Sequence, residues 1–193
     1  MKATKNKRFI LILFCIILLV FSLLFSYKTV LFFSDLTTAQ ENVFAFLEGK
    51  QELASEFTER EASHLEDVKK VMKYADHFFY LLLLMTTGII TYYRKDKEFL
   101  LKSCNYGGKA TIAATVLFGV LAILFFDTVF TVFHEIFFPQ GNWTFSAESL
   151  LIQTFPLDFF VTISRNIFLV TFFLGILFIL SKHFYRHVRS NRH

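Results

Sequence analysis

Four long apolar segments constrain what this chain of 193 residues can fold into. A run of about 18 or more apolar residues is long enough, as an α-helix, to cross a hydrocarbon core about 30 Å thick. Such runs lie at about residues 9–33, 75–93, 110–133 and 159–181. The composition agrees, since 54% of the residues are hydrophobic and 28 of them are Phe. The sequence therefore predicts an all-α membrane protein, a four-transmembrane-helix bundle that forms a single integral membrane domain over residues 1–193.

The positively charged residues are distributed unevenly among the regions that flank these segments. They gather in the N-terminus, in the connection after the second segment and in the C-terminus (Lys2, Lys5, Lys7 and Arg8; Arg94, Lys95, Lys97, Lys102 and Lys109; Lys182, Arg186, Arg189 and Arg192). The connection 34–74 is rich in acids, and residues 131–162 contain no Lys or Arg. Because Lys and Arg accumulate on the cytoplasmic side of membranes, both termini are predicted to be cytosolic. The connections 34–74 and 134–158 are then predicted to form an extracellular cap, and the net charge of +4 does not indicate nucleic-acid binding.

The two cysteines are not expected to form a disulfide. Cys15 lies within the first apolar segment, and Cys104 lies in the predicted cytosolic connection. The two thiols are therefore predicted to occupy different levels of the membrane, and the cytosol is a reducing compartment. Each cysteine is interpreted as a packing or surface residue.

The first outer connection is predicted to contain the start of a long helix. Thr58 and Glu61 have the spacing of a capping box, in which each side chain satisfies a free backbone donor of the other residue. No Gly or Pro follows until Gly88, so a helix from residue 59 is predicted to run straight into the second membrane segment. One face of it carries His64, Asp67, Val68 and Val71. Several apolar residues upstream are expected on the membrane surface or against the other outer connection (Phe44, Phe46, Leu47, Leu53 and Phe57).

The second outer connection is crowded with aromatic residues between positions 130 and 145. Pro139 and Gly141 predict a turn, after which Ser146 is predicted to cap a short helix over 147–154. On the helix before the turn, four residues fall on one stripe and place a carboxylate two turns from a histidine (Asp127, Phe130, Thr131 and His134).

His64 and His134 are the candidate functional histidines, because each lies at the outer end of a predicted helix with carboxylates nearby in sequence. The alternative is that both are hydrogen-bonded polar caps. The other histidines are interpreted as an interface anchor and as solvated residues of a basic tail (His77; His183, His187 and His193). Asp127 is a candidate because a carboxylate in an apolar helix is costly. It has a structural alternative, since Arg165 can pair with Asp127 or with Asp158.

Motifs in both outer connections resemble those of the bacterial lipoprotein intramolecular transacylase family. The first is TEREASHLEDVK at 58–69, and the second comprises FHEIFF at 133–138, GNWTF at 141–145 and LLIQTFP at 150–156. The resemblance covers nearly the whole chain. It implies a multi-pass protein of the bacterial cytoplasmic membrane, with its active site at the extracellular face. It also implies membrane lipids and diacylglyceryl-modified lipoproteins as partners, and no cofactor or metal.

The reaction that the resemblance implies is an acyl shift within one substrate molecule. The acyl chain at the glyceryl sn-2 position moves to the α-amine of the lipidated cysteine, which gives an N-acyl, S-monoacylglyceryl lipoprotein, the lyso form. By motif match, His64 and His134 are the catalytic residues, which agrees with the need for acid/base chemistry in ester aminolysis. Three carboxylates are candidates for orienting the imidazoles (Asp67, Asp127 and Glu135). Four aromatic residues are candidates for lining the substrate chamber (Phe133, Phe138, Trp143 and Phe145).

The residues alone leave two other classes of function open. A metal-dependent membrane hydrolase is one, because histidines and carboxylates bind zinc. However, the sequence lacks the H-E-x-x-H pattern, and His134-Glu135 has no second His one turn later. The other is a non-enzymatic small polytopic membrane protein, in which both histidines tolerate replacement.

Overall fold

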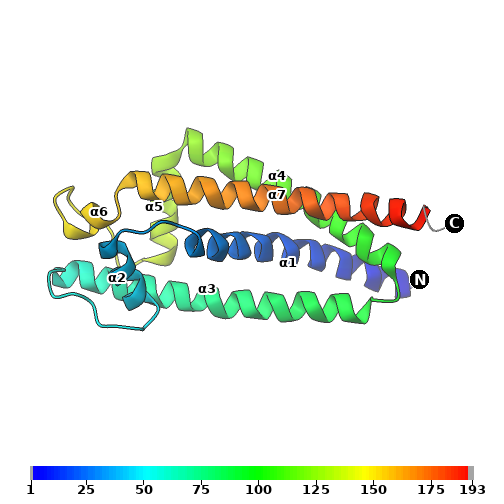
Figure 1. Ribbon diagram of the computed structural model, residues 1–193, viewed down its shortest axis with the longest axis horizontal. Helices are drawn as coiled ribbons and strands as arrows, with labels where there is room; N and C mark the ends of the chain where they lie inside the picture. The colour runs from blue at the N-terminus through cyan, green and yellow to red at the C-terminus, as the bar shows by residue number, and fades with distance from the viewer. Residues whose placement is uncertain (1, 191–193) are drawn as a thin grey trace. The chain divides into compact units, whose positions relative to one another are not determined.

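The computed structural model describes residues 2–190, and all of its regular structure is helical (Figure 1). The helices are α1 (Lys2–Phe32), α2 (Thr38–Leu47), α3 (Glu59–Tyr92), α4 (Lys97–Leu124), α5 (Phe126–Phe137), α6 (Leu150–Thr154) and α7 (Leu157–Ser190). Four of them are long and apolar enough to cross a membrane, over Asn6–Phe32, Glu59–Tyr92, Lys97–Leu124 and Leu157–Lys182. The predicted all-α fold with four membrane helices is confirmed.

The helix α3 confirms the prediction that residue 59 starts a helix continuing without interruption into the second apolar segment. Its 34 residues correspond to about 51 Å at 1.5 Å per residue, which exceeds the thickness of a hydrocarbon core. Charged residues recur up to Asp76, so only the part of the helix after Asp76 is apolar enough to lie in lipid. The first four turns of α3 therefore belong outside the membrane-spanning segment.

The third apolar segment differs from the prediction of one helix over 110–133. The helix α4 ends at Leu124, Phe125 adopts a non-helical conformation with φ −135° and ψ 41°, and α5 begins at Phe126. No Gly or Pro stands between residues 120 and 138, so apolar periodicity alone could not reveal the break. The consequence is that His134 is carried by a separate short helix.

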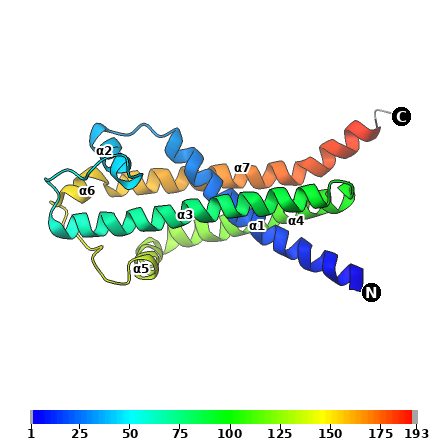
Figure 2. The ribbon, with the colours of Figure 1, turned by 90° about the horizontal axis from the view of Figure 1, so that it is seen from below.

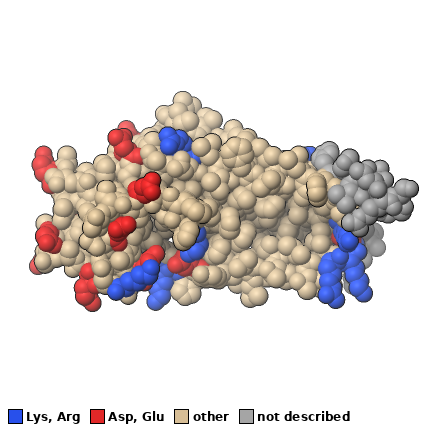
Figure 3. Space-filling model, viewed as in Figure 1, with Lys and Arg blue, Asp and Glu red and all other residues tan. Residues whose placement is uncertain are grey.

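The described chain divides into two compact units, and the single integral membrane domain expected from the sequence stays a prediction. The first unit consists of Met1–Val30, Phe79–Val120 and Asn166–His193, and the second consists of Leu31–Phe78 and Leu121–Arg165. The acidic residues of the chain fall in the second unit, except for Asp96 and Glu98, which fall in the first. On the face in Figure 3, acidic side chains gather over the second unit, whereas the helices of the first present a broad uncharged surface.

In the first unit, long helical segments run lengthwise along one another, and the turned view shows α1 inclined to the others (Figures 1 and 2). Small residues allow close contact between them. A Cβ added to Gly107 would lie 2.7 Å from Leu18, and one added to Gly108 would lie 2.6 Å from the Gly175 carbonyl oxygen. Such close backbone approach is how helices associate in lipid, where burying apolar side chains gains little.

The cysteines also lie in the first unit, and their predicted separation was wrong. The Cys15 thiol donates to the Ser103 carbonyl oxygen at 3.9 Å, so Cys15 lies beside the residue that precedes Cys104. Both thiols are free. The prediction placed Cys104 in a connection, but α4 already begins at Lys97 and carries Cys104 into the helix bundle.

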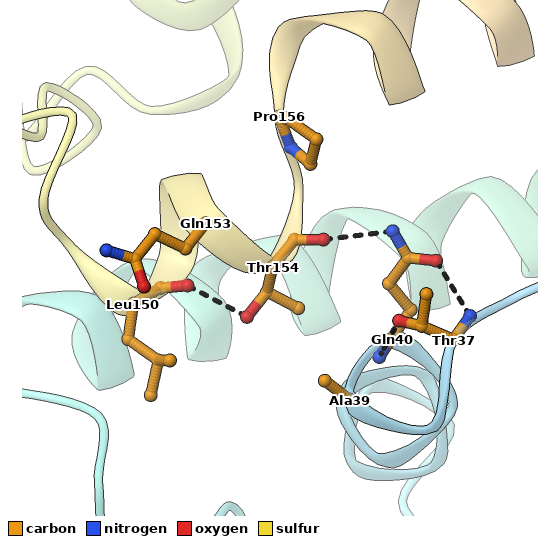
Figure 4. Close-up of a pocket in the computed structure, with 7 residues that line it drawn as sticks. All are labelled: Thr37, Ala39, Gln40, Leu150, Gln153, Thr154 and Pro156. Carbon is orange, nitrogen blue, oxygen red and sulfur yellow. Dashed lines mark hydrogen bonds between the residues drawn. The ribbon is translucent and has the colours of Figure 1, made fainter.

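The second unit has an apolar core formed by both outer connections. Its buried members come from α2, α3 and α6 and from the residue after α6 (Val43, Phe46, Leu47, Leu65, Leu151 and Phe155). Of the two predicted locations for the apolar residues near position 44, packing against the other outer connection is therefore confirmed. A polar bridge joins the same elements, since Gln40 accepts from the Thr37 N–H at 3.1 Å and donates to the Thr154 carbonyl at 2.9 Å (Figure 4).

The capping box at the start of α3 is present, and it does more than cap. Glu61 accepts from the Thr58 N–H at 2.8 Å, while Thr58 Oγ1 accepts from the Glu61 N–H at 3.3 Å. The other Glu61 oxygen accepts from the Leu151 N–H at 2.9 Å, and the side chain is only 2% exposed. Glu61 thus fixes α6 to the start of α3.

The cap of α6 differs from the prediction. The helix covers Leu150–Thr154, and its N-cap is Ser149, whose hydroxyl accepts from the Ile152 N–H at 3.3 Å. Ser146 instead begins a turn in which its carbonyl accepts from the Ser149 N–H. Both serines are suitable caps, and the turn delays the start of the helix by three residues.

Candidate active site

The second unit brings the two candidate histidines together. His64 lies on α3 and His134 on α5, and their ring centroids are 6.4 Å apart with an interplanar angle of 25°. His64 is buried, with 7% of its surface exposed, and His134 is half-buried. Two helices from different outer connections therefore place two imidazoles within reach of a single small group.

Aromatic rings surround the pair. Phe138 and Phe145 lie with ring centroids 4.8 and 5.6 Å from that of His64, and Trp143 lies 4.9 Å from His134. Phe138 is almost fully buried, at 3% exposure, whereas Phe133 is 46% exposed and sits beside His134 at 5.3 Å. Three of the four candidate chamber residues thus enclose the histidines, and Phe133 lies at the edge.

The hydrogen bond of His134 determines which of its nitrogens is free. Its Nδ1 lies 2.8 Å from the Phe130 carbonyl oxygen, one turn earlier on α5. A carbonyl oxygen can only accept, so Nδ1 carries the proton and Nε2 keeps its lone pair. The neutral imidazole is therefore held ready to accept a proton at Nε2.

Burial acts on both imidazoles in the same direction. It lowers the pKa of His134, against a smaller opposing effect of the Phe130 carbonyl. It also lowers the pKa of His64, to which His134 adds a repulsion, while Asn142 and Asp67 act in the opposite direction. Because the ordinary pKa of histidine is about 6.5, both rings are neutral at neutral pH.

The carboxylate of Asp67 lies close to the pair but forms no hydrogen bond with either histidine among the described contacts. It accepts from Lys70 Nζ at 3.0 Å, from Asn142 Nδ2 at 2.9 Å and from Gln140 Nε2. Burial acts to raise the pKa of Asp67, but these donors overcome it and hold the pKa below its usual value. Asp67 is therefore an ionised acceptor that organises the turn after α5.

Asn142 is the residue that sequence reasoning missed, although the matched motif contains it. Its Nδ2 also donates to Ser63 Oγ at 3.2 Å, so both amide protons are used on α3. Gly141, with φ +75°, makes the turn that carries Gln140 and Asn142 to this side of α3. The only available signal was the predicted turn at Pro139 and Gly141, which specified no partner.

Asp127 and Glu135 are not brought to the histidines. Both are exposed on α5, and no hydrogen bond or ion pair joins either to His64 or His134 among the described residues. An orienting role for them stays a prediction that no contact supports. Over the same residues, no three His, Cys, Asp or Glu side chains gather in a way that could hold a metal ion.

The fold and the site define the class of protein, which is a polytopic all-α membrane protein with a pair of neutral, partly buried histidines among aromatic rings. A family model described as lipoprotein intramolecular transacylase Lit matches residues 28–160. The match covers more than half of the chain, and the chain belongs to this family of transferases.

Solved structures and one curated relative resemble the chain. The lipoprotein intramolecular transacylase Lit of Bacillus cereus superposes with a TM-score of 0.78 at 19% identity, over 98% of this chain and 99% of its own. A variant of that protein with one histidine replaced by arginine gives 0.78 at 16% identity, over 99% and 96%. An uncharacterized protein of Aquifex aeolicus is 27% identical over 125 residues, which is 63% of this chain. The match spans only 54% of that relative's length.

Proposed function

We propose that this protein transfers the sn-2 acyl chain of an S-diacylglyceryl cysteine to the α-amine of the same cysteine. The substrate is a lipid-modified lipoprotein, and the product is the N-acyl, S-monoacylglyceryl lyso form. A nitrogen–carbon bond forms at the ester carbonyl and the carbon–oxygen bond to glycerol breaks. The amine loses one proton and the glyceryl oxygen gains one, so the reaction is balanced without a co-reactant.

The observation that carries the proposal is the approach of His64 and His134 to 6.4 Å between ring centroids. An α-amine has a pKa near 8 and is mostly protonated at neutral pH, so aminolysis needs a base. A neutral imidazole with a free Nε2 meets that need, and His134 has this form. The second imidazole stabilises the developing oxyanion or protonates the departing oxygen.

The surroundings of the pair suit an intramolecular transfer. Nucleophile and ester belong to one molecule, so holding them in a reactive geometry supplies several kcal/mol of the barrier reduction. The rings of Phe138, Trp143 and Phe145 exclude water from the histidines and so favour the amine over hydrolysis. They also match the apolar character of an acyl chain.

The distribution of charge supports a location for this reaction. The basic residues of the termini and of the connection 94–109 favour the cytosolic side of a bacterial membrane for those regions. The second unit, with its histidine pair, then faces the extracellular side as a cap. Lipid-modified cysteines are exposed on that side.

Mass spectrometry of lipoprotein N-termini tests the proposal in a bacterial host that lacks the activity. Expression of the intact chain is expected to yield the lyso form, and His64→Ala or His134→Ala is expected to reduce it by at least about 100-fold. The matched control is His77→Ala, because His77 Nδ1 bonds the Lys73 carbonyl in the same way that His134 bonds Phe130. His77 is exposed and outside the pair, so its replacement should leave the yield unchanged.

Undiminished formation of the lyso product by either His64→Ala or His134→Ala would contradict the catalytic role proposed for these histidines. If the intact chain itself gives no lyso form while both variants accumulate normally, a non-enzymatic role becomes the better reading of the fold.

A further inference from the structure

Two buried polar atoms beside the histidine pair have no hydrogen-bond partner among the described residues. They are Nδ1 of His64 and Oδ1 of Asn142. An unpaired buried polar atom is costly, and native structures contain few of them. The two atoms are complementary, since Nδ1–H is a donor and an amide oxygen is an acceptor. Asn142 lies near enough to His64 to raise its pKa, although the geometry of a formed hydrogen bond is not reached.

The neighbours of Asn142 determine which way its amide faces. Its Nδ2 donates to Asp67 Oδ2 at 2.9 Å and to Ser63 Oγ at 3.2 Å. Asp67 is ionised and can only accept, so exchanging the amide nitrogen and oxygen would set two acceptors against each other. The orientation of Oδ1 is therefore decided by Asp67. Lys70 and Gln140 hold the carboxylate in turn.

We propose that Asn142, oriented by Asp67, is the positioning residue of His64, with its side-chain oxygen accepting the Nδ1 proton of that imidazole. The inference rests on the proposed function and extends it to residues that do not touch the substrate. With Nδ1 engaged, the lone pair of His64 lies at Nε2. His134 has the same arrangement, with the Phe130 carbonyl in the place of Asn142. Both imidazoles then present Nε2 as the reacting nitrogen.

The groups around His64 predict the direction in which its pKa changes when Asn142 is replaced. Asn142 and Asp67 favour its protonated form, whereas burial and His134 oppose it. Arg60, one turn earlier on α3, is directed to Thr144 and the Phe145 ring. Removal of the Asn142 side chain should therefore lower the pKa of His64 further and leave its ring less well oriented.

The test uses the full chain with Asn142→Ala, Asn142→Asp, Asp67→Asn and the double variant Asn142→Asp/Asp67→Asn. Asn142→Ala is expected to lower kcat by about 100-fold with little change in KM, and to move the His64 limb of the pH–rate profile to lower pH. Asn142→Asp sets two carboxylates against each other, whereas Asp67→Asn leaves an amide that can face Asn142 with either its oxygen or its nitrogen and so no longer fixes the orientation of Oδ1. The double variant restores the pair with its direction reversed, so it should recover most of the rate. Gln153→Ala is the control, because it removes an exposed amide on α6.

A direct titration separates this inference from the proposed function. NMR of ¹³C-labelled histidine in the detergent-solubilised protein, with the His64 signal assigned by His64→Gln, should show a lower pKa in Asn142→Ala than in the parent chain. That result supports the inference even if the protein makes no lyso-lipoprotein. An unchanged His64 pKa overturns it, as does a rate loss that appears only in KM or a double variant no better than the singles.

Discussion

The two compact units of this protein differ in the interactions that stabilise each of them internally. The second unit has an apolar core of large side chains, with buried polar residues such as Glu61 and Gln40 linking its helices. The first unit relies on glycines at helix contacts and on buried hydroxyls, among them Ser22 and Ser26, which bond back to their own helix. Burial of apolar surface stabilises a unit in contact with water but gives little between helices in lipid. The histidine pair therefore lies in the unit whose apolar core resembles that of a water-soluble domain.

The largest effect on stability is expected from Phe46→Ala in the second unit. Phe46 is 3% exposed within the core, and Lys69 Nζ lies 4.1 Å from its ring centroid. Loss of the ring should lower the free energy of unfolding by about 4 kcal/mol, measured by denaturant titration in detergent. Phe33→Ala removes a ring that is 77% exposed and should cost much less. Equal costs would contradict the view that this unit depends on an apolar core.

The next effect concerns the polar link of the same unit. Glu61→Ala removes the acceptor of the Thr58 and Leu151 N–H groups and leaves the Leu151 donor unpaired. A cost of about 3 kcal/mol is expected in the same titration, with loss of transacylation because α6 is released from α3. Glu59→Ala, at an exposed position two residues earlier, is the control. If Glu61→Ala costs no more than Glu59→Ala, the bond from Glu61 to Leu151 does not stabilise the contact between α3 and α6.

A smaller effect is expected where the first unit is closest packed. Gly108→Ala would place a Cβ 2.6 Å from the Gly175 carbonyl oxygen, so α4 and α7 must separate. The cost should be about 2 kcal/mol in thermal or denaturant unfolding. Gly119→Ala meets no atom within 4 Å and should be neutral or slightly stabilising. If both substitutions behave alike, close glycine packing does not hold this unit together.

The smallest effect is the response of stability to mild acid. The pKa values of His64 and His134 are lowered in the folded chain, so the unfolded chain binds more protons just below the ordinary value of about 6.5. The free energy of unfolding should therefore fall as the pH decreases through that region, and level off below the lowered pKa values. Replacing both histidines with Gln should flatten the dependence, whereas Gln153→Ala, which removes an exposed uncharged side chain, should not. A rise in stability toward acid would contradict the burial of the pair.

Local rules were sufficient for several features of the site. The capping box at Thr58 and Glu61 and the uninterrupted helix after it follow from residue spacing, and both are observed. The distances between elements could not be obtained in this way. Neither the link from Glu61 to Leu151 nor the turn of Asn142 onto Asp67 has a pattern, because each joins segments far apart in the sequence.

Some errors arose where two local signals were equally good or absent. Ser146 and Ser149 are both acceptable caps, and only the turn between them decides that α6 starts after Ser149. At Phe125 the helix breaks without Gly or Pro, so the short helix that carries His134 was hidden within an apolar run. The apolar run that starts at residue 110 places Cys104 outside the membrane helices, but α4 begins at Lys97 and brings the residue before Cys104 next to Cys15.

The sequence by itself determined the number of membrane helices, the start of α3 and the two histidines that are candidates for the site. Those features depend on segment length, apolar content, capping chemistry and motif spacing, all of which are local in the chain. Only the tertiary structure decided that the imidazoles approach to 6.4 Å, that aromatic rings bury them and that Asn142, bonded to Asp67, lies next to His64. These depend on how α3 meets the turn after α5, where packing and hydrogen bonds between distant residues select one arrangement.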